Sequence, residues 1–419
     1  MTRIDRRHFL AGVGTAAAGT AVASVGLGSI AGADTGNSTP GEIVAHDGLL
    51  GQVPFDGRYQ AGILTPRQDQ ATFVALDSLN PNRAALALAL QDLTVRIRQL
   101  TAGGSASQAP IDAPPPDSGT IGPMILPDSL TVTVAFGASL FDQRYGLAHQ
   151  RPAGLITMPR FPNDDTDPAR SGGDLLLQIC ANHRDTVVHA FREIMRVLDG
   201  AFAVRWTIDG FQGENRGPTA RSSRRNLFAF RDGTANPDLT DNDLMHQLVW
   251  VNAGRGPSWT ANGTYQIIRT IRMHVEFWDR VGLEEQQNMI GRVRTTGAPL
   301  GGTDEFQDPR YDLDPHGRRI PLDAHIRLAN PRTAATADQR LLRRGYSYHR
   351  GVDSASTLDQ GLIFCAFNQD PTRQFATIQT RLSGEPMTDY ITPVGGGYFF
   401  AAPGTVDQRG WLGASLFSS

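Results

Sequence analysis

The order of apolar runs along the chain limits its fold more than any other feature. Strand-like runs and segments with helical periodicity alternate as strand, helix, strand, strand, helix, strand through the first half. The strand-like runs are ATFVALD, LTVTVAFG, DLLLQICAN and the segment around Trp206, and another, QAGILTP, precedes them. This order predicts a ferredoxin-like α+β unit on an antiparallel sheet.

Two helices are expected in this half. Asn80 is the expected cap of the first helix, and Pro81 suits its first turn. Its apolar face repeats at Leu86, Leu90, Leu93, Ile97 and Leu100. A Gly/Ser/Pro-rich loop follows, and the second helix is expected over residues 186–199, before Gly200. Its inward residues are Val187, Phe191, Ile194 and Leu198.

The second half repeats this pattern. A pair of strands is expected over residues 264–279, a helix over 283–292, a buried strand over 361–368 and a helix over 371–382. Residues 395–397, three consecutive glycines, are expected to bend the chain between strands. The sequence therefore predicts an α+β fold of two ferredoxin-like halves, each an antiparallel sheet with helices.

The chain has 419 residues, which is longer than a domain with a single hydrophobic core usually is, so two domains are expected. We expect a signal peptide over residues 1–33, a polar leader over 34–50, an N-terminal ferredoxin-like domain over 51–218 and a C-terminal one over 219–419. The boundary is placed within the polar loop 212–225.

The first residues are typical of a twin-arginine export signal. Arg6 and Arg7 are followed by Phe9 and Leu10, then by an uncharged stretch rich in Gly and Ala that ends before Asp34. A membrane anchor is the alternative, although Gly and Ala replace the large apolar residues of a spanning helix. This route carries folded proteins, often with a cofactor, to the periplasm, the cell wall or the medium.

Composition argues against nucleic acid as a partner and against several kinds of metal site. All 39 basic residues are arginine and the formal net charge is −3, so nucleic acid is not an expected partner. Cys180 and Cys365 stand alone in apolar runs, which leaves a cysteine zinc site, an iron–sulfur cluster and c-type haem attachment without ligands. We expect both to be buried strand residues, with a disulfide between them as the alternative.

Three segments contain candidate site residues. His325, in RIPLDAHIRLANPR, is either a structural hydrogen-bonding residue or an iron ligand. Arg343 and Arg344 are adjacent on an expected strand, so they should point to opposite faces. Asp232, in FAFRDGTANP, belongs either to a tight Asp-Gly turn or to a site that moves a proton beside a bound oxidant. His246 and His274 lie in apolar surroundings and are expected to be structural.

Nine stretches in order make the chain resemble the dye-decolourising peroxidase family, within it the exported deferrochelatase/peroxidase branch. They are VPFDGRYQAGILTP, MPRFPNDD, DLLLQICAN, FRDGTANP, HVEFWDR, GAPLG, DAHIRLANPRTA, LLRRGYSY and PVGGGYFFA. Together they run from about residue 52 to the C-terminus. One position departs from the family's GxxDG motif, because Ala229 stands where its first glycine is expected.

The resemblance implies a site for one non-covalent haem b per chain, mainly in the C-terminal half. It makes His325 the proximal ligand of the haem iron, Asp232 the distal acid/base and Arg343 the distal arginine. Other residues implied to line the haem are Gly233, Thr234, Ala235, Asn330, Pro331 and Arg332. A hydrogen bond from the second nitrogen of His325 to an acceptor would strengthen it as a ligand; Asp323 is one candidate acceptor, and the sequence leaves the partner open.

The implied activity is peroxidase chemistry. Hydrogen peroxide would be the oxidant, and phenolic, dye-like or porphyrin compounds the reductants, with release of iron from haem as a further activity. The alternative is a non-enzymatic haem carrier for iron uptake, which needs an axial ligand but no distal pair such as Asp232 and Arg343. Implied partners are iron-uptake proteins of the membrane and a second copy of the chain.

Overall fold

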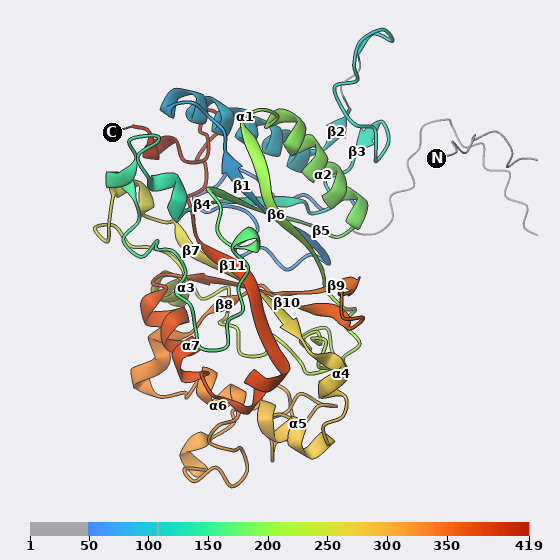
Figure 1. Ribbon diagram of the computed structural model, residues 1–419, viewed down its shortest axis with the longest axis vertical. Coiled ribbons are helices and arrows are strands. Elements are labelled where there is room, and N and C mark those ends of the chain that lie inside the picture. Colours follow the sequence, from blue (N-terminus) through green and yellow to red (C-terminus); the bar gives the residue numbers. More distant parts are fainter. Residues whose placement is uncertain (1–48, 107–108, 419) are drawn as a thin grey trace, which may run out of the picture. The chain divides into compact units, whose positions relative to one another are not determined.

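The computed structural model describes residues 49–106 and 109–418 (Figure 1). The expected signal peptide and residues 34–48 of the leader therefore lie outside the described residues. No helix within the described part of the chain is long and apolar enough to span a membrane.

The N-terminal half has the predicted ferredoxin-like order. Its elements are β1 (Gln70–Ser78), α1 (Arg83–Ala102), β4 (Thr131–Gly137), β5 (Leu175–Ala181), α2 (Arg184–Val197) and β6 (Phe202–Phe211). The strands lie side by side as β4-β5-β1-β6, and all neighbouring pairs are antiparallel. The run QAGILTP, expected as a strand, forms turns instead. A separate two-stranded sheet joins β2 (Gly104–Ser105) to β3 (Met124–Ile125).

Helix α1 begins two residues later than expected. Asn82, rather than Asn80, caps it by accepting a hydrogen bond from the backbone N–H of Ala85 at 3.0 Å. The side chain of Asn80 donates instead to Ser78 and to the carbonyl of Ala201. The apolar face is confirmed, because Leu86, Leu90, Leu93, Ile97 and Leu100 are all buried. On α2, Val187, Ile194 and Leu198 are buried as predicted, and Phe191 is half-buried.

The C-terminal half also has ferredoxin-like order, with a longer first crossover. Its strands are β7 (Thr264–Met273), β8 (Leu342–Arg343), β9 (Tyr346–Val352), β10 (Leu358–Asn368) and β11 (Ile391–Ala401). Four of them lie in the order β11-β7-β10-β9, and the short β8 also pairs with β10. The helices are α3 (Asn242–Leu248), α4 (Val275–Trp278), α5 (Leu283–Ile290), α6 (His325–Ala329) and α7 (Thr377–Arg381). The strand pair expected over residues 264–279 is therefore wrong, because β7 ends at Met273 and α4 follows it.

The glycines at 395–397 lie inside β11, not in a bend between strands. A β-carbon on Gly395 would lie 2.5 Å from the carbonyl oxygen of Arg170, and one on Gly396 would lie 2.0 Å from that of Ile268. Gly396 also has a φ of 125°. These glycines therefore let other backbone segments approach the strand closely.

The two halves share one sheet. Strand β11 pairs with β4, β6 pairs with β9, and β10 pairs back with β7, so the order β7-β11-β4-β5-β1-β6-β9-β10 closes on itself. Sequence patterns predicted a ferredoxin-like unit in each half, but not the joining of the two sheets. The boundary between residues 218 and 219 stays a prediction. Cys180 and Cys365 are buried strand residues and are unpaired.

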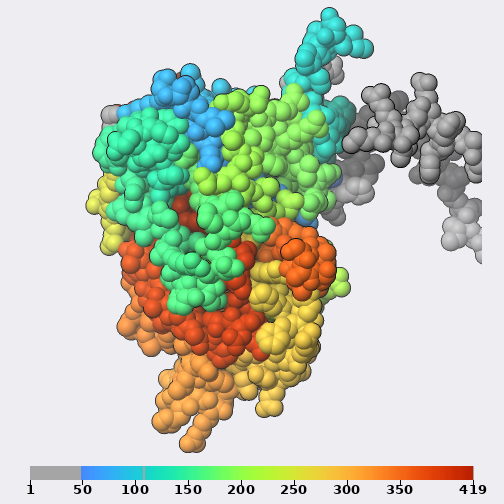
Figure 2. Space-filling model, in the orientation of Figure 1, coloured from blue at the N-terminus to red at the C-terminus, as the bar shows by residue number. Residues whose placement is uncertain are grey.

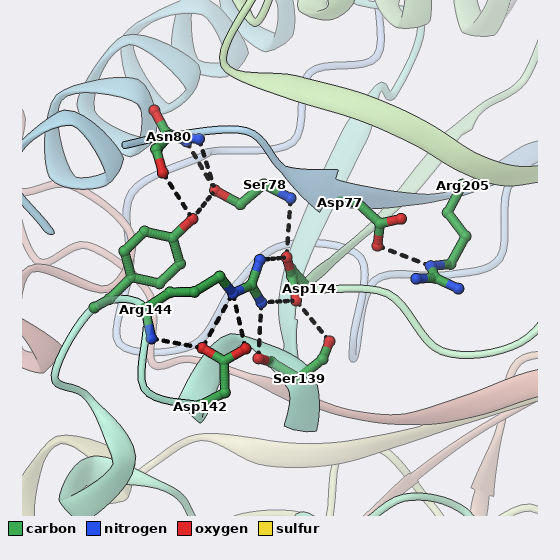
Figure 3. A network of polar contacts seen from close by, with 9 residues as sticks. Asp77, Ser78, Asn80, Ser139, Asp142, Arg144, Asp174 and Arg205 are labelled. Carbon is green, nitrogen blue, oxygen red and sulfur yellow. Dashed lines mark hydrogen bonds and ion pairs between the residues drawn. The ribbon is translucent and has the colours of Figure 1, made fainter. Parts of the chain in front are cut away.

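A polar network fixes the turns at the ends of β1 and β5 (Figure 3). The buried carboxylate of Asp174 accepts hydrogen bonds from the backbone of Ser78, from Ser139 and from two nitrogens of Arg144. Burial alone would raise the pKa of Asp174, but these hydrogen bonds outweigh it and hold the pKa below its usual value. Arg144 also contacts the exposed Asp142.

Candidate functional site

Residues from three separate segments line one cavity in the C-terminal half. Asp232 lies in the loop before α3, His325 is the first residue of α6, and Arg343 ends the short strand β8. All three line the cavity, so the fold brings together the three candidate site residues that the sequence analysis identified.

His325 is held by a carboxylate distant in the sequence. Its Nδ1 lies 2.8 Å and 3.1 Å from the two oxygens of buried Glu385, 60 residues away. Burial alone would lower the pKa of His325, but the adjacent Glu385 carboxylate raises it above its usual value. With Nδ1 occupied, Nε2 is the ring nitrogen available to a ligand.

Asp323, the candidate acceptor near His325 in the sequence, is not its hydrogen-bond partner. Asp323 is exposed, and none of the hydrogen bonds found among the described residues joins it to His325. The chain turns into α6 directly after Asp323, so sequence proximity does not bring its carboxylate to the imidazole. Glu385 reaches it from the segment after α7.

Asp232 and Arg343 form an ion pair at the cavity. Nη1 of Arg343 donates to Oδ1 of Asp232 at 2.9 Å, and the two side chains are 30% and 24% exposed. Asn236 fixes this geometry, because its side chain donates to the carbonyl of Arg343 and accepts from the backbone N–H of Arg343. Gly233 has a φ of 100° and accepts a hydrogen bond from the Asn236 N–H. The Asp-Gly turn is therefore present, and it places Asp232 at the cavity.

The two adjacent arginines point in different directions, as strand alternation predicted. Arg344 is 2% exposed and donates to Gln68 at 3.2 Å and to the carbonyl of Thr65. Only Arg343 of the two lines the cavity.

Ala229 has a φ of 67°, in the left-handed region that favours glycine. Its N–H donates to the carbonyl of Asn226 and its own carbonyl accepts from Arg225. The substitution in the GxxDG motif thus places a side chain where the backbone is strained.

The cavity walls combine apolar surface with cationic and hydroxyl groups. The apolar residues include Phe228, Phe230, Ile271, Met273, Ile290, Leu341, Leu362, Phe364, Phe375, Ile378, Leu382, Met387 and Ile391. The polar ones include Arg231, Arg269, Arg292, Arg332, Arg340 and Tyr311. Of the residues that the resemblance places around haem, Gly233, Thr234, Ala235, Asn330 and Arg332 line this cavity, and Pro331 is not among the lining residues.

These walls fit a haem group. The hydroxyl of Tyr311 and Nη1 of Arg269 are buried and have no hydrogen-bond partner among the described residues. Burial raises the pKa of Tyr311 to about 12, so its hydroxyl remains a donor at neutral pH. An imidazole ligand, apolar walls and donors for carboxylates match the iron, macrocycle and propionates of haem.

Sequence reasoning missed Glu385, Tyr311 and the cavity arginines Arg292 and Arg340. Glu385 follows a Ser-Gly turn and no motif links it to His325. His246 and His274, expected to be structural, do not line the cavity, and they hydrogen-bond with Tyr59 and Thr392 respectively.

Family models and close relatives cover nearly the whole described chain. The model described as "Dyp-type peroxidase, N-terminal" matches residues 60–212, and "Dyp-type peroxidase, C-terminal" matches residues 223–406. A protein of Escherichia coli (strain K12) named deferrochelatase is 46% identical over 98% of this chain and 96% of its own length. One from Yersinia pestis bv. Antiqua with the same name is 46% identical over 87% of this chain and 85% of its own.

Solved structures agree with these matches. The DyP-type peroxidase of Cellulomonas bogoriensis is 35% identical, with a TM-score of 0.79 over 90% of this chain and 100% of its own. Ferric DtpA of Streptomyces lividans is 32% identical, with a TM-score of 0.79 over the same shares of the two chains. The chain therefore belongs to the DyP-type peroxidase family of haem enzymes.

Proposed function

We propose that the cavity binds one non-covalent haem b per chain, with Nε2 of His325 as the iron ligand. The supporting observations are Nε2 of His325, which Glu385 does not contact, the apolar walls, and the hydroxyl of Tyr311 and Nη1 of Arg269, which make no hydrogen bond within the described residues. Thr234, Ala235 and Asn330 would contact the macrocycle, and Arg332 and its neighbouring cavity arginines would bind its propionates.

When bound, haem would supply the redox chemistry, with hydrogen peroxide as the two-electron oxidant and a reductant that restores the resting iron. With haem in place, Oδ2 of Asp232, the oxygen to which Arg343 does not donate, would take a proton from hydrogen peroxide and return it to the departing peroxide oxygen. The guanidinium of Arg343 stabilises negative charge as it develops on that oxygen. Glu385 accepts from Nδ1 of His325 and so fixes the ring with Nε2 as the ligand atom.

The observation that carries this proposal is the ion pair of Asp232 and Arg343 in the cavity that also holds His325. A haem carrier needs an axial ligand and apolar walls. Haem binding alone does not require the Asp232 carboxylate and the Arg343 guanidinium that Asn236 holds in place. The geometry therefore supports an enzyme over a carrier.

The reductants we propose are phenolic, dye-like or porphyrin compounds. The relatives of Escherichia coli and Yersinia pestis named deferrochelatase support release of iron from haem as a second activity of the same site. We further propose export through the twin-arginine route, to the periplasm, cell wall or medium, and interaction with iron-uptake proteins of the membrane or with a second copy of this chain.

A single comparison tests the haem site. The wild-type chain and His325→Ala are loaded with haem, and haem content, the ferric spectrum, peroxide-dependent oxidation of a phenol and formation of free porphyrin are measured. We expect His325→Ala to retain less haem and to lose the histidine-ligated spectrum. Full haem content with an unchanged spectrum would show that another residue binds the iron, and haem binding by the wild-type chain without peroxide-dependent oxidation would favour the carrier.

A further inference from the structure

A second cluster of potential ligands lies outside the cavity, in the N-terminal half. It consists of Asp117, His189 and Glu193, whose ligand atoms all lie within 4.8 Å of one another. His189 and Glu193 are one turn apart on α2, and Asp117 comes from the loop between β2 and β3. All three residues are buried, with exposures of 7%, 1% and 1% respectively.

His189 has an unsatisfied nitrogen that points into this cluster. Its Nδ1 lies 3.2 Å from the hydroxyl oxygen of Ser118, which also accepts a hydrogen bond from Thr120. Its Nε2 lies 3.4 Å from Oδ2 of Asp117, yet it is buried and makes no hydrogen bond within the described part of the chain. A buried polar atom without a partner is costly, and an ion bound between Nε2 and the carboxylates would remove that cost.

The surrounding groups orient all three ligands. The backbone N–H of Ser118 donates to Oε1 of Glu193 at 2.8 Å, and that of Gly119 donates to Oδ1 of Asp117 at 2.8 Å. Each carboxylate therefore keeps its second oxygen for the cluster. With Ser118 accepting from Nδ1 of His189, Nε2 is left as the ligand atom, which is the usual outer-shell arrangement around a metal-binding histidine.

Arg96 is the group that an ion would displace. Its Nη2 lies 3.3 Å from Oδ2 of Asp117 and also contacts Oε2 of Glu193. The Arg96 side chain is 17% exposed, so it can turn toward solvent. Ligand atoms about 2.1 Å from a tetrahedral ion lie about 3.4 Å apart, so the ligand atoms, which lie within 4.8 Å of one another, would move together by up to about 1.4 Å when the ion binds.

The loop that carries Asp117 has no buried apolar side chain among its described residues. Among the described residues from 102 to 127, Asp117 is the only buried one, and residues 110–116 are all exposed. Figure 2 shows part of this segment, in cyan, standing out from the surface. The polar cluster therefore fastens this loop to α2, together with Arg196 of α2, which donates to the carbonyl of Pro115.

We propose that Asp117, His189 and Glu193 bind one divalent first-row transition-metal ion, which displaces Arg96 and fastens the loop to α2. One imidazole nitrogen and two carboxylate oxygens are ligands typical of Zn²⁺ and of neighbouring divalent ions. Water or a second carboxylate oxygen would complete the coordination.

The test measures Zn²⁺ binding by the full chain without a histidine tag. The chain is loaded with haem beforehand, so that His325 is occupied. Isothermal titration and metal analysis should give one Zn²⁺ per chain for the wild type. His189→Asn and Glu193→Gln should each weaken binding about 100-fold, and Arg96→Met, which removes the competing cation, should strengthen it about 10-fold. Zn²⁺ should also slow cleavage by proteinase K between residues 110 and 116 in the wild type, but not in His189→Asn.

His183→Asn is the matched control. His183 precedes the same helix and its Nδ1 lies 2.8 Å from Asp128, but among the described residues this pair has no third ligand. Its substitution should leave Zn²⁺ affinity unchanged. The proposal is overturned if neither the wild type nor Arg96→Met binds Zn²⁺, or if His189→Asn binds it as tightly as the wild type.

Discussion

Arg343 donates a 2.9 Å hydrogen bond to Asp232, although 111 residues separate them in the sequence. Asn236 contacts the backbone of Arg343 on one side and the Gly233 turn on the other, so the pair is fixed by the turn that follows Asp232. Because His325 lines the same cavity, a proton carrier, a cation and an iron ligand lie together.

Glu385→Gln tests how His325 is held. Loss of the carboxylate charge should weaken the imidazole as a donor, so the ferric/ferrous midpoint potential should rise and haem affinity should fall by roughly 10-fold. Redox titration and haem transfer to apomyoglobin measure the two effects. Asp323→Asn makes the same change in charge on an exposed side chain and should alter neither. Equal effects of the two substitutions would contradict the specific role of Glu385.

Asp174→Asn tests the network of Figure 3. Removing the charge should lower the free energy of unfolding by about 2 kcal/mol, less than for a fully buried pair because Arg144 is 39% exposed. Asp142→Asn, which contacts the same arginine from an exposed position, should cost about 0.5 kcal/mol or less. Urea denaturation measures both, and equal losses would show that burial of Asp174 adds nothing.

The contribution of the Asp174–Arg144 ion pair to the free energy of unfolding should depend on pH. The folded-state pKa of Asp174 is lowered, so the stabilisation is complete above its unfolded-state pKa of about 3.9 and is lost as pH falls through the folded value. The stability difference between wild type and Asp174→Asn should therefore be constant near neutral pH and shrink below about pH 4. A difference that grew on acidification would have the wrong sign.

Ala229→Gly tests the strained turn before Asp232. Relief of the positive φ should outweigh the greater chain entropy of glycine and raise the free energy of unfolding by about 0.5–1 kcal/mol. Thermal denaturation would show this as an increase in Tm. Ala203→Gly, in β6 and without a positive φ, should instead lower it. A lower Tm for Ala229→Gly would mean that the alanine is accommodated without strain.

The expected signal peptide is tested by changing Arg6 and Arg7 together to Lys. If they direct export of the folded chain, haem-loaded protein should accumulate in the cytoplasm while peroxidase activity of the lysate persists. Cell fractionation followed by immunoblotting measures this. Unchanged export of the double variant would indicate another route.

Local patterns in the sequence predicted the elements more reliably than the contacts between them. The apolar repeat from Leu86 to Leu100 identified α1, and strand alternation separated Arg343 from Arg344, because both depend on neighbours along the chain. Closure of the sheet through β11 and β4 depends on pairing between distant strands, which leaves no local signal. Glu385 was missed for the same reason, since its partner is 60 residues away.

The rate of the reaction between haem-loaded protein and hydrogen peroxide tests the central claim that Asp232 and Arg343 act together at the haem. Haem-loaded wild type, Asp232→Asn, Arg343→Leu and the double variant are mixed with excess hydrogen peroxide by stopped flow, and the first spectral change is followed. Each single substitution should slow it by about 10²- to 10⁴-fold, with Arg343→Leu at least as damaging as Asp232→Asn. Because the two residues share one step, the double variant should lose less than the product of the single losses. Single variants that react at the wild-type rate would contradict the account.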